Sequence, residues 1–110
     1  MVALLTKLSA KEVDEALASL EGWKRESDFI RKTFEFKTFM EGIKFVNEVA
    51  AIAEGLEHHP DVHIRWTSIR LEIQTHDEGG ITPMDIKLAT RIESSLARVS
   101  GRKKERKAKA

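Results

Sequence analysis

All four histidines of this chain fall between positions 58 and 76, and three of them are the first residues that indicate chemistry. His58 and His59 are adjacent and precede Pro60, and His76 follows after an alternating apolar/polar segment. Imidazole is the side chain best matched to moving protons near neutral pH, because its unperturbed pKa is about 6.5. Two acids flank the group: Glu54, one helical turn before His58, and Asp85 further on. The segment therefore predicts an acid/base site.

The residues between the histidines predict how they are brought together. Positions 62–75 alternate apolar and polar residues, as half-buried strands do, and the alternation changes phase at Thr67-Ser68, which we take as a hairpin turn. That turn pairs Trp66 with Ile69, Ile64 with Leu71 and Val62 with Ile73 on an apolar face, and Arg65 with Arg70, His63 with Glu72 and Asp61 with Gln74 on a polar one. The same register places His59 opposite His76, within reach of one small ligand.

The rest of the chain supplies the supporting elements. Ser9 and Glu12 form a capping-box signature for a helix over Ala10 to Glu21, and a strand-like pattern from Trp23 to Phe36 turns at Ser27-Asp28. Apolar residues at helical spacing predict a second helix from Thr38 to Leu56, and a third that begins at Pro83, with Thr82 as N-cap, and closes at Gly101. The order α-β-β-α-β-β-α predicts an α+β fold: a four-stranded antiparallel sheet with three helices packed on one face.

These motifs together resemble the pterin-4a-carbinolamine dehydratase family. The resemblance is carried by Glu54-x-x-x-His58-His59-Pro60, the aromatic Trp66, Thr75-His76 and Gly80-Ile81-Thr82-x-x-Asp85-x-x-Leu88-Ala89, and also by Leu20-x-Gly22-Trp23 and Phe34-x-Phe36-x-x-Phe39. It runs from about Leu20 to Ala97, which is nearly the whole chain. A lone His-His-Pro would be weak, and the combination is specific.

The resemblance implies a reaction and a set of residues. The reaction is removal of water from a 4a-hydroxy-tetrahydropterin to give the quinonoid dihydropterin that a reductase recycles. His58, His59 and His76 occupy the family's histidine positions, with His58 and His76 expected as acid/base groups and His59 as a positioning group. The resemblance implies no metal and no cofactor.

Further residues are expected to bind substrate. Glu54 and Asp85 could orient imidazoles, although either could be a surface charge, or for Asp85 a first-turn acid favoured by the helix dipole. Thr75, Asp77 and Glu78 lie where the family presents main-chain groups to the pterin ring, and the alternative is an ordinary strand end. Trp23 could wall the heterocycle or belong to the core, whereas the alternation assigns Trp66 to the core.

Two other uses of histidine are weaker. His63 is expected to pair with Glu72 on the polar face and is not counted as catalytic. A zinc site would need ligand spacing that the sequence lacks, because extended His58 and His59 point to opposite faces and Pro60 prevents a helix that would unite His59 with His63.

Composition fits one domain. At 110 residues, without cysteine, the chain has neither disulfides nor thiolate chemistry, and its opening residues are too short an apolar run for a signal peptide or a membrane span. We expect a cytoplasmic protein with no membrane partner, a domain over residues 1–101 and a basic, disordered tail over 102–110. The tail lacks aromatic residues for base stacking, which argues against nucleic acid as its partner.

The competing function is a non-catalytic module that binds a pterin or a protein on the same fold, because members of the family also act as dimerisation partners of transcription factors. Another pterin substrate is a third possibility that the sequence leaves open. The resemblance implies a homodimer or homotetramer, and a small chain has a limited core. The third helix and the edge of the first hairpin are the candidate interfaces.

Overall fold

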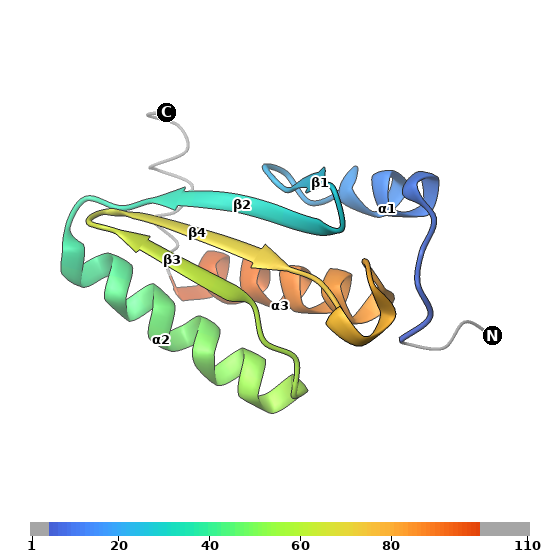
Figure 1. The fold of residues 1–110 in the computed structure, drawn as a ribbon. Coiled ribbons are helices and arrows are strands. Elements are labelled where there is room, and N and C mark those ends of the chain that lie inside the picture. Colours follow the sequence, from blue (N-terminus) through green and yellow to red (C-terminus); the bar gives the residue numbers. More distant parts are fainter. Residues whose placement is uncertain (1–4, 100–110) are drawn as a thin grey trace.

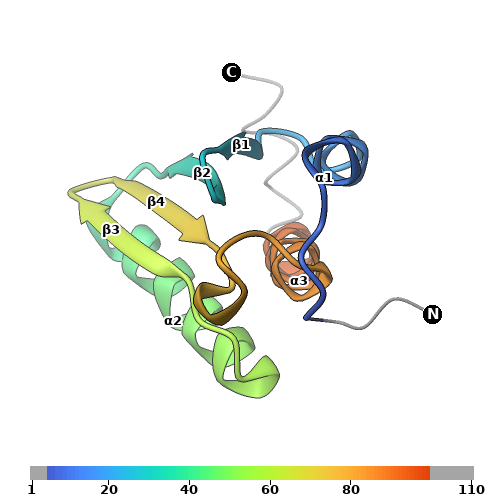
Figure 2. The ribbon, with the colours of Figure 1, turned by 45° about the vertical axis from the view of Figure 1, so that its right-hand side comes forward.

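A computed structural model describes residues 5–99 and confirms the predicted α+β fold. The strands β1 (Lys24–Glu26), β2 (Phe29–Glu35), β3 (Asp61–Arg65) and β4 (Ser68–Ile73) form one antiparallel sheet in the order β1-β2-β4-β3. The helices α1 (Ala10–Leu17), α2 (Phe39–Leu56) and α3 (Pro83–Val99) lie on one side of it (Figures 1 and 2). A short 3₁₀ helix, η1 (His76–Glu78), follows β4.

The central strands explain why the helices stay on one side. In β4 every second residue is completely buried, namely Ile69, Leu71 and Ile73, and the residues between them face solvent on the other side of the sheet. Ile30 and Phe34 of β2 continue this apolar face. The core is closed from the helix side by buried residues of α2 and α3: Phe45, Val49, Ala53, Leu88, Ala89 and Ile92.

The first helix is shorter than its sequence pattern predicts. The capping box of Ser9 and Glu12 is present in both directions, with hydrogen bonds of 2.8 and 3.1 Å. The helix ends at Leu17 instead of Glu21, and residues 18–22 form turns that place Leu20 and then Trp23 in the core. Tertiary burial of these two side chains outweighs the local helical preference.

The first hairpin is as predicted, with Ser27 and Asp28 between β1 and β2 and Glu26 paired with Phe29. The second hairpin corrects the predicted register. Its turn is Trp66-Thr67 and not Thr67-Ser68, so that Ile64 pairs with Ile69 and Val62 with Leu71. This moves each β3 residue two positions along β4, which keeps every side chain on its predicted face.

The register change removes Trp66 from the core. It adopts a left-handed conformation with φ of 56° at the hairpin tip and is 76% exposed, which corrects its assignment as a core residue. The new pairing also sets His63 opposite Arg70, not Glu72, and the ladder no longer directs His59 to His76. Placing Trp66 on the apolar face of β3 would have buried little of its ring. This edge strand is poorly covered by the helices, and its Val62 and Ile64 are 37% and 46% exposed.

Three expectations fall outside this description. The end of the third helix near Gly101 and the basic tail from Arg102 lie beyond the described residues, so the predicted domain limits stay predictions. Between residues 5 and 99, none of the helices has the length and apolar character needed to cross a membrane. The cytoplasmic location stays a prediction.

Candidate active site

His58 is positioned by the way α2 ends. Glu57 adopts the left-handed conformation, with φ of 54°, its N–H donates to the Glu54 carbonyl at 3.2 Å, and the His58 N–H donates to the Ala53 carbonyl at 3.0 Å. These two bonds form a Schellman motif, which satisfies the last helix carbonyls and reverses the chain. His58 follows directly after this reversal, and its side chain is only 12% exposed.

Asp85 meets His58 from the start of α3. Its Oδ1 lies 2.5 Å from His58 Nε2, and its Oδ2 accepts a hydrogen bond from the Thr82 N–H at 2.8 Å. The second bond is one half of a capping box, the half that the third helical residue supplies, and the N-cap Thr82 hydroxyl accepts from the N–H of the second residue, Met84, at 3.2 Å. One fully buried carboxylate therefore caps α3 and holds an imidazole from α2.

Thr75 completes this cluster from the end of β4. Its Oγ1 donates to Asp85 Oδ2 at 2.9 Å, lies 2.8 Å from Thr82 Oγ1 and 3.4 Å from His58 Nε2. A backbone bridge between Thr75 and Gly80 closes the η1 loop, whose last turn needs the positive φ of 69° that Gly79 adopts. The loop stands beside the last turn of α2 and the start of β3 in both views (Figures 1 and 2).

His59 forms a separate, exposed pair. Its Nε2 lies 2.6 Å from Glu54 Oε2, and the two side chains are 58% and 77% exposed. Glu54 thus orients an imidazole, as the sequence suggested, but it acts on His59 and not on His58. In water such a pair contributes little to stability, so its structural effect is to restrict the ring of His59.

The remaining predicted residues of the loop are exposed. His76, Asp77 and Glu78 form η1, directly after Thr75, so the chain connects them to the buried cluster by one peptide bond. Within residues 5–99 these three side chains have no hydrogen bond or ion pair to another residue, and all three are exposed to solvent.

Trp23 lies elsewhere. It is 4% exposed, its indole N–H donates to Glu93 Oε2 at 2.9 Å, and its ring meets Phe34 edge-on at 6.1 Å between centroids. The structure does not bring it together with the three histidines. His63 is also separate, on the open face of β3, with its Nε2 3.4 Å from Glu72 Oε1.

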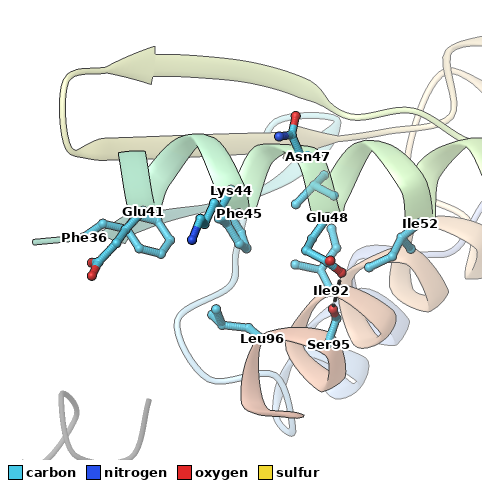
Figure 3. A pocket seen from close by; sticks show the side chains of 11 residues that line it. Phe36, Glu41, Lys44, Phe45, Asn47, Glu48, Ile52, Ile92, Ser95 and Leu96 are labelled. Carbon is cyan, nitrogen blue, oxygen red and sulfur yellow. Dashed lines mark hydrogen bonds between the residues drawn. The ribbon is translucent and has the colours of Figure 1, made fainter. Parts of the chain in front are cut away.

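A pronounced hollow lies away from the histidines. It measures about 650 Å³ and lies between α2 and α3, with apolar walls that include Phe45, Ile52, Ile92 and Leu96 (Figure 3). The Ser95 hydroxyl donates to Glu48 across it at 3.1 Å. We assign the chemistry to the histidine cluster, because no histidine lines this hollow and Glu48 already receives a hydrogen bond.

Within residues 5–99, no three histidine, aspartate or glutamate side chains gather in an arrangement that could hold a metal ion. What the cluster can do is exchange protons. It offers an imidazole fixed by a buried carboxylate, a second imidazole beside an exposed carboxylate and a third on an adjacent loop.

Comparison with known proteins identifies the family of this chain. Residues 6–95 match the family model described as pterin 4 alpha carbinolamine dehydratase. The chain belongs to that family. A protein of a Roseiflexus species, provisionally named a pterin-4-alpha-carbinolamine dehydratase, is 47% identical over 84% of this chain and 100% of its own length. A Mycobacteroides abscessus protein with the same provisional name is 42% identical over 88% of this chain and 100% of its own.

A solved structure of the family has the same fold. The crystal structure of a transcriptional coactivator/pterin dehydratase from Brucella melitensis is 33% identical, covers 81% of this chain and 97% of its own, and superposes with a TM-score of 0.78. The name of that protein includes both functions that the sequence left open. The dehydratase family model matches residues 6–95. The choice between a dehydratase and a binding protein therefore depends on what the site can do.

Thr82 is the residue whose place in the site the sequence did not reveal. Its role as N-cap was predicted, and so was a site role for Asp85, three residues later. The signal that could have joined them is the reciprocal capping pattern Thr82-x-x-Asp85. Recognising it would still not have shown that His58 takes the other carboxylate oxygen, because that contact joins two distant helix ends.

Proposed function

We propose that this chain dehydrates a 4a-hydroxy-tetrahydropterin to the quinonoid dihydropterin and water by histidine acid/base catalysis. The observation that carries the proposal is the contact of 2.5 Å between His58 Nε2 and the buried Asp85. A buried carboxylate against one ring nitrogen fixes the imidazole and leaves the other nitrogen for proton exchange. The family shows the same reaction class in its name.

The reaction needs two proton transfers. The N5–H bond of the pterin breaks as a base takes the proton, and its electron pair forms the C4a=N5 double bond. The C4a–O bond breaks as that double bond forms, and the departing hydroxyl leaves as water because an acid protonates it. We assign these transfers to His58 and His76, and we assign positioning of the pterin to His59, which Glu54 holds.

Other residues contribute binding in this proposal. Thr75 lies in the buried cluster, and the exposed η1 residues Asp77 and Glu78 offer backbone groups to the donor and acceptor edge of a pterin. Trp23 stays a prediction as a ring-stacking residue, although its buried position beside Phe34 favours a core role. The proposal names the pterin class and no particular pterin.

A stopped-flow assay of 4a-hydroxy-tetrahydropterin dehydration tests the proposal. Wild type should accelerate the reaction, and His58→Ala and His76→Ala should each lower kcat by roughly 10²–10⁴-fold, the range for one acid/base group. His63→Ala is the matched control, because it removes the fourth histidine from the open face of β3. Wild-type rates in the His58 and His76 variants would refute the assignment.

The second candidate is a binding module. It is favoured by the Brucella melitensis protein, whose title also calls it a transcriptional coactivator. In the same assay, folded wild type that binds a pterin without accelerating dehydration would support this candidate over the enzyme.

We also propose that the chain forms a homo-oligomer. The edge strand β3 leaves Val62 and Ile64 partly exposed, with Trp66 next to them. An exposed edge strand invites pairing with another strand. Two copies of β3 that pair antiparallel about His63 would place Asp61 of each copy opposite Arg65 of the other, and Val62 opposite Ile64.

A further inference from the structure

Two threonine hydroxyls lie behind the His58–Asp85 pair, in the protein interior. Thr82 is completely buried and Thr75 is 7% exposed. Their Oγ1 atoms are 2.8 Å apart. Neither side chain has an acid/base role in the proposed reaction. The close contact of the two buried hydroxyls therefore indicates a different role.

The hydroxyl protons can be placed by counting donors and acceptors. Thr75 has one hydroxyl proton, and it donates this proton to Asp85 Oδ2 at 2.9 Å. The contact between the two hydroxyls therefore uses the proton of Thr82. The Thr82 oxygen in turn accepts from the Met84 N–H at 3.2 Å. Each bond thus points the same way, from the start of α3 through Thr82 and Thr75 to Asp85.

This direction decides where the proton of His58 lies. Asp85 Oδ2 already accepts two hydrogen bonds, from the Thr75 hydroxyl and from the Thr82 N–H, so Asp85 acts in this cluster as a hydrogen-bond acceptor. An ionised carboxylate only accepts hydrogen bonds. Its contact of 2.5 Å with His58 Nε2 must then be donated by the ring.

We propose that Thr82 and Thr75 are positioning residues that act through Asp85 to keep His58 in the tautomer protonated at Nε2. The neutral ring then has its lone pair on Nδ1, the atom that would accept the N5 proton of the pterin. The role of Nδ1 as acceptor of the N5 proton rests on the proposed function. The tautomer of His58 does not depend on it. Without the hydroxyl chain, Asp85 would hold His58 with fewer hydrogen bonds fixing its own orientation.

A simple helix-capping role predicts something different. Capping needs only the lone pair of Thr82 Oγ1 toward Met84, and it does not involve Thr75. Thr75→Val removes the donor to Asp85 while leaving the cap of α3 intact. Thr75→Ser and Thr82→Ser keep both hydroxyls. Thr90→Val is the matched control, because Thr90 Oγ1 donates to the Ile86 carbonyl on the exposed side of α3.

The test is nitrogen NMR of the histidine rings, recorded on ¹⁵N-histidine-labelled protein without substrate at a pH where the rings are neutral. Wild type, Thr75→Ser, Thr82→Ser and Thr90→Val should show His58 protonated at Nε2, with Nδ1 as the bare nitrogen. Thr75→Val and Thr82→Val should show His58 exchanging between both tautomers. If Thr82→Val does not fold, Thr75→Val carries the test, since its helix cap is unchanged.

The same variants in the dehydration assay give a second measurement. Thr75→Val should lower kcat by about 10- to 100-fold, the range known for outer partners of metal-bound histidines, and Thr75→Ser should restore it. An unchanged His58 tautomer in folded Thr75→Val would overturn the inference. Wild type that keeps the Nε2–H tautomer and does not accelerate dehydration would refute the proposed function and support the inference.

Discussion

Asp85 serves three neighbours with two oxygens. Oδ2 accepts from the Thr82 N–H at the start of α3 and from the Thr75 hydroxyl, and Oδ1 holds His58, so that a bond of local helix chemistry and a bond of the site share one side chain. The sequence raised these two roles as alternatives, and the geometry satisfies both. An acid that caps a helix is already fixed in place, which makes it a precise support for an imidazole.

Replacement of Asp85 by Asn tests that double role. The amide has one oxygen and one NH₂ group, so it cannot accept from Thr75, Thr82 and His58 in the way that a carboxylate does. Asp85→Asn should reduce kcat by roughly 10²–10⁴-fold and the free energy of unfolding by about 1–3 kcal/mol. Steady-state kinetics and urea denaturation measure the two effects. Asp28→Asn, in the exposed turn between β1 and β2, is the control that should change neither.

At this scale the sequence predicted residue types and missed their contacts. The spacing predicted three histidines and two acids for the site, because acid/base chemistry restricts the residue types that can perform it. It assigned Glu54 to His58, one helical turn away, whereas Glu54 pairs with His59. The Schellman reversal after Leu56 ends the helical geometry on which that assignment depended.

At the scale of elements, the end of α2 carries strain that the site uses. Glu57 occupies a left-handed position that glycine commonly takes, and this costs a residue with a Cβ about 1–2 kcal/mol. The reversal that it makes is what separates His58, inside, from His59, outside. Strand periodicity could not predict this separation, because the two histidines are not in a strand.

Glu57→Gly should therefore raise the free energy of unfolding by up to about 1 kcal/mol. Relief of the left-handed strain exceeds the roughly 0.5–1 kcal/mol that glycine loses through the freedom of the unfolded chain. Urea denaturation measures the change. Glu57→Ala removes the carboxylate and keeps the strain, so it should unfold close to wild type. A lower stability of Glu57→Gly than of Glu57→Ala would contradict this account of the cap.

The bond between α1 and β1 gives a pH dependence. Arg25 Nε and Nη2 donate to the two oxygens of Asp14 at 2.9 and 3.1 Å, and this pairing holds the pKa of Asp14 below its ordinary value of 3.8. A carboxyl with a lowered pKa in the folded state stabilises the protein at higher pH, and the stabilisation is lost as the pH falls through the folded-state pKa.

Asp14→Asn should consequently lower Tm at pH 7 by a small amount, because both partners are exposed and screened by water. The difference in Tm from wild type should shrink as the pH falls below 4 or so. Thermal unfolding followed between neutral and acidic pH measures it. A difference that grows toward acidic pH would show that the pair has no such role.

Strand parity explains why most of the fold could be predicted although one hairpin was wrong. The predicted and observed pairings of β3 with β4 differ by two residues along the strand, and side chains alternate with a period of two. All faces were therefore right, and only the turn residues changed. The prediction for Trp66 was wrong for this reason, because Trp66 is a turn residue and a turn residue belongs to neither face of the sheet.

At the scale of the whole molecule, the sheet has two unequal edges. β1 is a three-residue edge strand composed of charged residues, whereas β3 carries partly exposed apolar side chains. Short charged edges discourage pairing and apolar edges favour it. The exposed apolar residues therefore favour β3 as the interface between copies of the chain. The edge of the first hairpin, which the sequence had suggested as an interface, is less favoured because it is short and charged.

A charge exchange on β3 tests the proposed assembly. Arg65→Glu would place two acids opposite each other at both ends of a paired strand, and should weaken association by several-fold, since like charges opposed across strands cost about 0.2–1 kcal/mol per pair. The double variant Asp61→Arg/Arg65→Glu restores opposite charges and should restore association. Sedimentation velocity measures the oligomeric state. Equal association in all three proteins would exclude this pairing, as would monomeric wild type.

The two tryptophans differ in a way that has a practical consequence. Trp23 is 4% exposed and hydrogen-bonded to Glu93, whereas Trp66 at the hairpin tip is 76% exposed. An aqueous collisional quencher such as iodide should dim the long-wavelength emission of Trp66 and leave the fluorescence of Trp23 largely unchanged. The native chain thus carries two optical reporters, one of core integrity and one of whether the tip beside β3 is covered.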